Sequence, residues 1–442
     1  MKYIKNKIFV FLSISLIIFN SYLCKSLENE YSEDDDVIAT ITSDNESALR
    51  DALLILWKFG GTIYIDTPVI NIKQQESLTI KGSILGSIIG IKQSNGEYPR
   101  LNFIEQRDIS SLLYVPGITL TGSNILISYL IIENAGTTGI FIDGQKNMID
   151  HVISRYNGQS GFYLSSKSDS NVLQNCYSYR NFHFIESIIS EGFTLEVGGI
   201  DNIFTYCFAW ENSENGFGNI YWDGKHRNGE IFYLHSASWN NGNINVFSGK
   251  YDFDNGKPLD KNLWTIQQII KSDENFEKNY NNKKFNLNGA TINSIPAKEY
   301  FTTYYYNHEN EGNGFNFGNK RNEQNSLSRR TSDYCVAFDN KLKGFNNNDS
   351  ENFTGIMTNC VGFNNNMNYE LPYTFLKWNN NWGWGGKEED KLDMDLGIKK
   401  PYNENSSKKN FYSIRDKIIK AVYANTFPEN IDFEKTIKGL NE

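Results

Sequence analysis

The sequence predicts an all-β protein whose chain coils as a parallel β-helix, a single-stranded solenoid with an N-terminal α-helical cap and a C-terminal extension. One short pattern returns from about Val115 to Tyr369: a small residue or Cys, then an aromatic residue, then Asn, then Gly-Phe. The same region holds short strand-like runs bounded by Gly, Asn and Ser, and it lacks helical spacing. A pattern that returns every 20–50 residues is typical of a solenoid.

The Asn of this pattern is expected to form a ladder through the solenoid. Aligned copies stand at Asn157, Asn181, Asn212, Asn241, Asn340 and Asn365. A buried Asn at the same position of successive rungs, the single turns of the coil, can bond the backbone and the Asn residues above and below it. Such bonds satisfy an amide whose burial would otherwise be costly.

The position two residues before this Asn is aromatic in most copies. We expect these side chains to stack in the core or in half-buried packing; they are Tyr179, Trp210, Trp239, Phe338 and Phe363. In the first copy the position holds Arg155, so we expect a gap in the aromatic series there.

Residues 1–26 are expected to be a secretory signal peptide. Lys2, Lys5 and Lys7 precede an apolar run from Ile8 to Phe19, which is too short for a membrane span. No other stretch approaches 18 apolar residues, so we expect a secreted, extracellular protein without a membrane span.

Residues 27–43 are acidic and polar and are expected to be a disordered lead-in to the β-helix. Ser43 or Asp44 can then cap a helix over residues 46–59, which Gly60-Gly61 ends before a strand. This helix would cap the first rung, whose free edge would otherwise favour aggregation.

The β-helix domain is expected over residues 44–376. Residues 257–306 break the repeat and are polar, so we expect a loop excursion there. Residues 377–442 are expected to form a C-terminal extension, with an amphipathic helix over 412–424 that closes the end of the solenoid or lies along its side.

Four cysteines, Cys176, Cys207, Cys335 and Cys360, occupy the same position of the repeat, where a small buried residue is expected. Two interpretations stay open. Export favours one or two disulfides between neighbouring rungs. The shared position favours stacked free thiols instead.

The net charge of the chain limits the classes of molecule that it can bind. Lys and Arg number 43 against 52 Asp and Glu, giving a net charge of −9 and a pI near 5.3. This disfavours nucleic acid and anionic membranes. An acidic protein that meets an acidic polymer needs a local cation, which makes Ca²⁺ worth considering.

Two carboxylates stand beside the repeat turns. Glu191 precedes Gly192-Phe193, and Glu214 precedes Gly216-Phe217. Stacked rungs would bring the two carboxylates to within about 5 Å, where they can share a hard cation. The alternative is a solvated surface pair.

The segments NCYSYRN, SEGF, YCFAWENSENGF, GNGFNFG and DYCVAFDNKLKGFNNN resemble the family 9 polysaccharide lyases, over roughly Gly117 to Asn366. The resemblance implies a right-handed parallel β-helix with pectate lyase activity. It places the family's calcium ligands at Glu191, Glu214, Asn215 and Gly218, where one ligand is a neutral amide and one is lost.

The resemblance also places the family's base, a Lys, at Asn316. β-Elimination requires a base for the proton next to the uronate carboxyl, and cations that stabilise the resulting enolate. Asn cannot accept a proton at neutral pH. Lys320 and Lys225 are weak candidates to replace it.

The sequence therefore predicts a monomeric, pectate-lyase-like protein that binds acidic plant-type polysaccharide such as pectate. Three alternatives stay open: an active lyase with an altered base and calcium site, a catalytically inactive relative that still binds carbohydrate, and a β-helix glycoside hydrolase, isomerase or structural surface protein.

Overall fold

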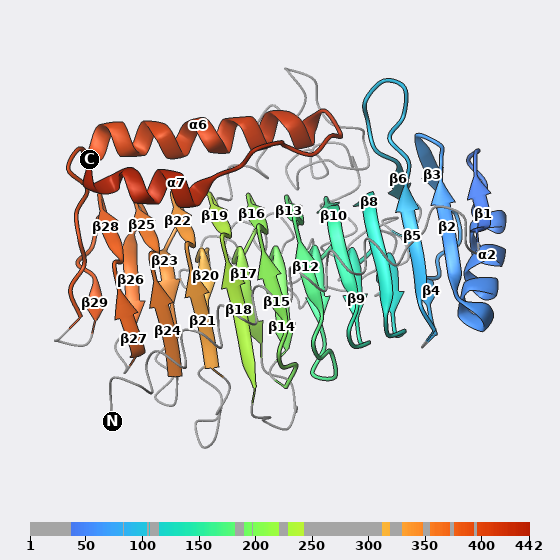
Figure 1. Ribbon diagram of the computed structural model, residues 1–442, viewed down its shortest axis with the longest axis horizontal. Coiled ribbons are helices and arrows are strands. Elements are labelled where there is room, and N and C mark those ends of the chain that lie inside the picture. The colour runs from blue at the N-terminus through green and yellow to red at the C-terminus, as the bar shows by residue number, and fades with distance from the viewer. Residues whose placement is uncertain are drawn as a thin grey trace, which may run out of the picture.

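The computed structural model is a parallel β-helix whose rungs stack along one long axis (Figure 1). The structure describes residues 37–82, 84–103, 106, 115–181, 190–196, 198–220, 229–242, 312–318, 329–347, 354–371, 375–392 and 396–442. The predicted signal peptide, residues 27–36 of the acidic lead-in and the 257–306 excursion lie outside these ranges.

Two parallel sheets run the length of the described chain. Sheet B consists of β4 (Leu78–Ile80), β7 (Ile118–Leu120), β9 (Ile140–Ile142), β11 (Phe162–Leu164), β14 (Phe193–Glu196), β17 (Phe217–Ile220), β20 (Phe315–Asn316), β23 (Lys343–Asn346), β26 (Met367–Leu371) and β29 (Lys391–Leu392).

Sheet A holds the remaining described strands. These are β1 (Val37–Ile41), β2 (Gly61–Ile65), β3 (Val69–Asn71), β5 (Gly86–Gly90), β6 (Arg100–Asn102), β8 (Ile125–Glu133), β10 (Met148–Arg155), β12 (Val172–Gln174), β13 (Tyr177–Tyr179), β15 (Ile203–Thr205), β16 (Phe208–Trp210), β18 (Glu230–Leu234), β19 (Ala237–Trp239), β21 (Arg329–Asp333), β22 (Val336–Phe338), β24 (Thr354–Thr358), β25 (Val361–Phe363), β27 (Phe375–Asn379) and β28 (Trp382–Trp384).

A typical rung passes from one strand of sheet B to two consecutive strands of sheet A, as in β14, β15 and β16. Single residues in the left-handed conformation make the bends: Tyr206 (φ 51°) separates β15 from β16, and Glu211 (φ 53°) follows β16. One such residue turns the chain without a long loop, so equivalent residues of successive rungs stay in register.

The Gly-Phe part of the repeat builds the interior. Phe162, Phe193, Phe217, Phe315, Phe345 and Tyr369 pair in register and stack with ring centroids 4.6–5.2 Å apart. Aliphatic residues of both sheets fill the rest of the core.

The predicted asparagine ladder is confirmed. Asn212 Oδ1 accepts bonds from the backbone N (3.2 Å) and Nδ2 (2.9 Å) of Asn181, and Asn212 Nδ2 donates to Asn241 Oδ1 (3.1 Å). The same bonds continue through Asn340 to Asn365. A second ladder at the opposite corner, Asn147, Asn171 and Asn202, was not predicted.

The four cysteines are free and buried, so the thiol alternative is confirmed and the disulfide alternative is wrong. Each Sγ donates to a backbone carbonyl of the preceding rung, as Cys207 Sγ does to Leu173 O at 3.3 Å.

The repeated aromatic residues stack on the outside of sheet A, away from the interior core. Rings from Tyr179 through Trp210, Trp239, Phe338 and Phe363 to Trp384 lie 4.5–5.5 Å apart in one column. Two C-terminal helices, α6 (Glu404–Tyr423) and α7 (Phe433–Lys438), cover this column through Phe411, Ile418 and Phe433 (Figure 1). A short 3₁₀ helix, η4 (Gly439–Asn441), ends the chain.

Arg155 does not leave the expected gap in this column. Its guanidinium lies 2.7 Å from Glu133 Oε2 and donates to Tyr179 Oη and Asn425 Oδ1, each at 2.8 Å. Asn425 follows α6, so Arg155 ties the end of that helix to the solenoid.

Several predicted boundaries are wrong in detail. Residues 37–41, assigned to a disordered lead-in, form β1, which pairs with β2. The helix α2 (Glu46–Phe59) is confirmed, but its cap is Asn45, whose side chain accepts from Ala48 N. The rungs continue past residue 376 through β28 and β29, and α6 begins eight residues before the predicted 412. Within the described chain no helix is long and apolar enough to cross a membrane.

We expect Asn212→Ala to lower the free energy of unfolding by about 2–4 kcal/mol, because it leaves the buried Asn181 donors without acceptors. The matched control is Asn410→Ala, at an exposed position of α6, with a change within about 0.5 kcal/mol. Urea unfolding followed by circular dichroism measures both variants. Equal stability of the two would contradict the structural role of the ladder.

Candidate functional site

The candidate site lies at the start of the central strands of sheet B, on the pleat opposite the stacked Phe core. Thr194 pairs with Gly218, and Asn316 pairs with Asn346, at the position that follows the core Phe in each strand. The turns that precede β14 and β17 hold Glu191 and Asn215. Register alone therefore brings most of the predicted site residues together.

Glu191 is the central group. It is 2% exposed, and Asn215 Nδ2 donates to its Oε1 at 2.9 Å. Its carboxyl lies over Gly218, where a Cβ atom would come within 1.7 Å of Glu191 Oε1. Burial raises the pKa of Glu191 to about 7, against the lowering effect of hydrogen bonds from Asn215 and Thr194.

Asn215 faces Glu191 with its NH₂ group. Its Oδ1 accepts from the backbone N (3.0 Å) and Nδ2 (2.8 Å) of Asn313 in the next rung. The amide oxygen, the atom that would bind a metal, thus already accepts two hydrogen bonds.

Glu214 lies in the neighbouring turn from Glu191, as predicted, but the side chain that meets Glu191 is Asn215. Glu214 Oε2 accepts from Ser190 N at 3.1 Å, and the side chain is 6% exposed. The expected solvated surface pair is therefore also wrong, because both carboxyls are buried.

These residues do not fit a calcium site of the kind that the family resemblance implies. Ca²⁺ takes six to eight oxygen ligands, several of them anionic. Here burial raises the pKa of the Glu191 carboxyl, the amide presents N–H groups, and Glu191 occupies the space of a side chain at Gly218. No group of three His, Cys, Asp or Glu residues able to hold a metal occurs in the described ranges.

Asn316, at the position of the family's base, is 6% exposed, and its Oδ1 accepts from Gly318 N at 3.4 Å. A neutral amide supplies no base here. The two replacement candidates, Lys320 and Lys225, lie outside the described residues.

Arg330 is a nearby cation that the sequence analysis missed. It pairs with Ile231, so it occupies a core-facing position of β21, and it is 5% exposed. Its Nη2 donates to Asn219 Oδ1 (3.3 Å), and Asn219 Nδ2 donates to Asn316 O (2.7 Å). Burial lowers the pKa of the Arg330 guanidinium. In the sequence, Arg330 is marked only by its charge, which stands at a strand position where a core-facing, apolar residue is expected.

Two accessible features flank this buried centre on sheet B. Phe141 and Tyr163, both partly exposed, pair across β9 and β11 with ring centroids 5.3 Å apart. Toward the other end, Lys343 and Lys391 both form ion pairs with Glu370. Burial would raise the pKa of Glu370, but the two lysines outweigh it and lower that pKa. None of these residues was predicted from the sequence.

The fold and the repeated rungs define a right-handed parallel β-helix of the polysaccharide-lyase type. The family model described as Pel9A-like, right handed beta helix region matches residues 32–257, and the chain belongs to this family. The predicted fold class and family resemblance are confirmed.

Individual relatives are distant. Pectate lyase L of Paenibacillus polymyxa (strain SC2) is 26% identical over 252 residues, which cover 53% of this chain and 54% of that protein. Pectate lyase L of Dickeya chrysanthemi is 27% identical over 103 residues, covering 23% and 24%. This chain thus spans about half the length of the first relative and about a quarter of the second.

Among solved structures, the crystal structure of pectate lyase Pel9A superposes with a TM-score of 0.56 at 18% identity, covering 90% of this chain and 88% of that one. At this identity the similarity shows the fold alone.

Glu191 should make stability fall with rising pH. Its raised pKa means that the folded state holds the proton while the unfolded chain releases it, from about pH 4.5 up to about 7. Relative to the native protein, Glu191→Gln should therefore gain up to about 3 kcal/mol between pH 4.5 and pH 8. Urea unfolding across this range measures the difference.

Addition of calcium chloride at pH 8 provides the control for this prediction. Without a calcium site, the native protein and Glu191→Gln should respond equally. Stabilisation by calcium that disappears in Glu191→Gln would show that Glu191 is a metal ligand and would contradict the absence of a calcium site.

Proposed function

We propose that the chain binds an acidic, plant-type polysaccharide such as pectate along the outer face of sheet B, without cleaving it by calcium-assisted β-elimination. One observation carries this proposal: the Glu191 carboxyl fills the space over Gly218 and bonds Asn215, beside a neutral residue at Asn316. Family membership and relatives named pectate lyase support the class of ligand.

The loss of elimination follows from the chemistry of the central groups. A base must take the proton next to the uronate carboxyl, and Asn316 has no basic atom. A cation cluster must lower the cost of the carbanion, and the Glu191–Asn215–Asn313 network offers no anionic cage for one.

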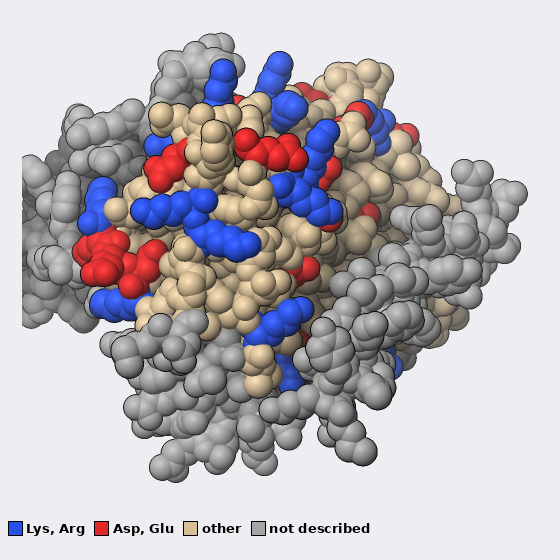
Figure 2. All heavy atoms as spheres, turned by 60° about the vertical axis from the view of Figure 1, so that its left-hand side comes forward, with Lys and Arg blue, Asp and Glu red and all other residues tan. Residues whose placement is uncertain are grey.

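Binding is supported by the two flanking features of sheet B. The partly exposed Phe141–Tyr163 pair offers ring faces against which the apolar face of a sugar can pack. Lys343 and Lys391 both form ion pairs with Glu370, and their ammonium groups are of the kind that binds a uronate carboxyl. Charges of both signs intermingle over the C-terminal end of the solenoid, which Figure 2 brings forward.

The cellular context is part of the proposal. The basic start and apolar run of residues 1–26 support export, which would bring the protein to extracellular polysaccharide as a monomer.

The binding face can be tested by affinity electrophoresis in gels that contain polygalacturonate. We expect the native chain to be retarded, and Phe141→Ala combined with Tyr163→Ala to weaken retardation about tenfold, because the sugar loses its packing surface. Circular dichroism verifies the fold of the variant.

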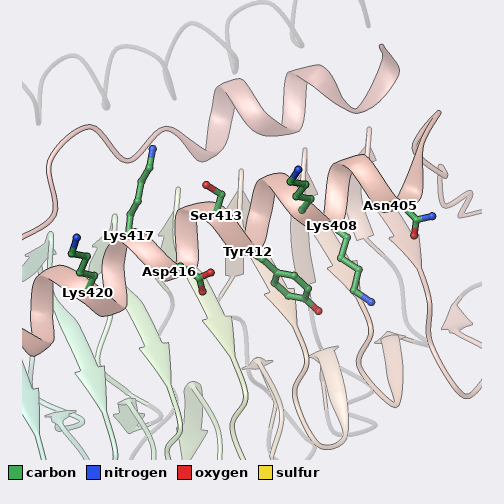
Figure 3. Close-up of a pocket in the computed structure, with 8 residues that line it drawn as sticks. Asn405, Lys408, Tyr412, Ser413, Asp416, Lys417 and Lys420 are labelled. Atoms are coloured by element: carbon green, nitrogen blue, oxygen red, sulfur yellow. The ribbon is translucent and has the colours of Figure 1, made fainter. Parts of the chain in front are cut away.

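The control for nonspecific attraction is Lys417→Ala combined with Lys420→Ala. Both lysines are exposed on α6 and point away from the strands (Figure 3). We expect this variant to bind as the native chain does. Equal loss in the α6 variant, or no retardation of the native chain, would contradict binding on sheet B.

The catalytic part can be tested by restoring the family's groups. We expect the native chain to release no ultraviolet-absorbing unsaturated uronides from polygalacturonate with calcium. Asn215→Asp, Gly218→Asp and Asn316→Lys together should also stay inactive, because the Glu191 carboxyl occupies the place of the new Asp at 218.

Adding Glu191→Asp to these three changes frees that space, and measurable release of unsaturated product is then expected. Product from the native chain would overturn the proposal that elimination is absent. Activity in the triple variant would show that the Glu191 carboxyl does not block the site.

A further inference from the structure

A column of rings runs along the corner between the two strands that each rung contributes to sheet A. In register, this column holds Tyr129, His151, Asn175, Tyr206, His235, Tyr334, Asn359 and Asn380, and every one of them is in the left-handed conformation (φ 49–58°). This corner is distinct from the site on sheet B.

The rings stack on both sides of Asn175. Tyr129 and His151 have centroids 4.7 Å apart, Tyr206 and His235 4.9 Å, and His235 and Tyr334 5.3 Å. These distances match the separation of neighbouring strands in a sheet. At Asn175 one ring is missing, which leaves His151 and Tyr206 two rungs, or about 10 Å, apart.

A cleft of about 490 Å³ lies at this missing ring. His151 and Tyr206 stand at its two ends, and Asn175 lies between them. Tyr177 and Phe208, buried and stacked at 5.3 Å, also line it.

The segment between α6 and α7 forms the outer wall of the cleft. It runs back along the tops of β13 and β16 in Figure 1 and lines the cleft with residues 428–431. In the same segment, Phe427 packs edge-on against His151 with centroids 5.2 Å apart. The cleft is therefore built by two parts of the chain more than 200 residues apart.

The polar groups of the cleft can form hydrogen bonds with the hydroxyl groups of a ligand. Asn175 Nδ2 donates to Asp150 Oδ1 at 3.1 Å, and His151 Nδ1 lies 2.9 Å from the same oxygen. This fixes the Asn175 amide and leaves its Oδ1 with no hydrogen bond from the described chain. The exposed side chains of Glu429 and Asn430 add polar groups at the rim.

We propose that this cleft binds a neutral pyranose ring, inserted between His151 and Tyr206 in place of the missing ring. Elsewhere in the column a single flat ring fills a gap of two rungs, as His235 does between Tyr206 and Tyr334, so the gap at Asn175 has room for one six-membered ring. A sugar chair fills it, with C–H groups against both rings and hydroxyls toward Asn175 and the rim.

The charges favour a neutral sugar over a uronate. The charged groups at the cleft include the carboxylates Asp150 and Glu429, and Glu434 and Asp432 lie near Tyr206. The imidazole of His151 lies against Asp150. A ligand carboxylate would meet like charge here. The inference goes beyond the proposed function, because it concerns another face and another class of sugar.

The test uses saturation-transfer NMR on the full chain with methyl β-D-glucopyranoside, methyl β-D-galactopyranoside and methyl β-D-xylopyranoside. We expect at least one of them to bind with a Kd of about 1–10 mM. Asn175→Tyr supplies the missing ring and should weaken that binding at least tenfold.

Tyr206→Asn inserts the residue that the column itself carries at Asn359 and should weaken binding about fivefold or more. The matched control is Tyr334→Asn, which removes a stacked ring outside the cleft and should leave binding unchanged. Circular dichroism and retained polygalacturonate binding show that the variants fold.

Three outcomes would overturn the proposal: no binding of any neutral glycoside by the native chain at about 50 mM, native-like binding by Asn175→Tyr, or preferential binding of D-galacturonate or phenol at the same residues. Binding of polygalacturonate on sheet B and binding of a neutral glycoside in the cleft can be tested independently. Phe141→Ala with Tyr163→Ala should spare the neutral glycoside, and Asn175→Tyr should spare polygalacturonate.

Discussion

The rest of this structure depends on the hydrogen bonds that the buried asparagine makes at the corner between sheet A and sheet B. Its side chain bonds both the backbone and the amide of the next rung, as between Asn181 and Asn212. These bonds hold each corner at the same place in every rung, next to a residue that bends the chain in the left-handed conformation. A fixed corner keeps the register, and register turns isolated residues into columns of Phe, Cys and outer aromatic rings.

Register also explains why the centre of sheet B is closed. Glu191 faces Asn215 and Gly218 because the strands that follow the two turns pair in register. A substitution at one of these positions therefore changes the surroundings of the others. The Glu side chain reaches over a residue that has none, and the larger group fills the space left by the smaller one. The result is a packed carboxyl group in place of an open cluster of anions, and its burial raises the pKa of Glu191.

Most of the features that could be predicted follow from the periodic pattern of the sequence. The coil, the cap at 46–59, the asparagine ladder and the family resemblance follow from patterns that recur along the sequence. The role of Arg155, the buried Arg330 and the Phe141–Tyr163 pair could not be predicted, because each depends on which side chain of another rung it meets. The ring column could not be predicted for a related reason. Tyr, His and Asn share its positions, so no single residue type repeats, and only strand register shows that Asn175 stands where its neighbours carry rings.

The C-terminal helices lie along the side of the solenoid, on the outer face of sheet A. A bare outer column from Tyr179 to Trp384 would be a long aromatic surface in water, and α6 and α7 bury it. Because the two helices lie along the coil, the segment that joins them must cross back over β13 and β16, and it passes beside the corner where one ring is missing. The apolar constraint that places the helices therefore also builds the outer wall of the His151–Tyr206 cleft. A binding face can arise in this way on a side of the solenoid far from its sealed centre, without any change in the rungs themselves.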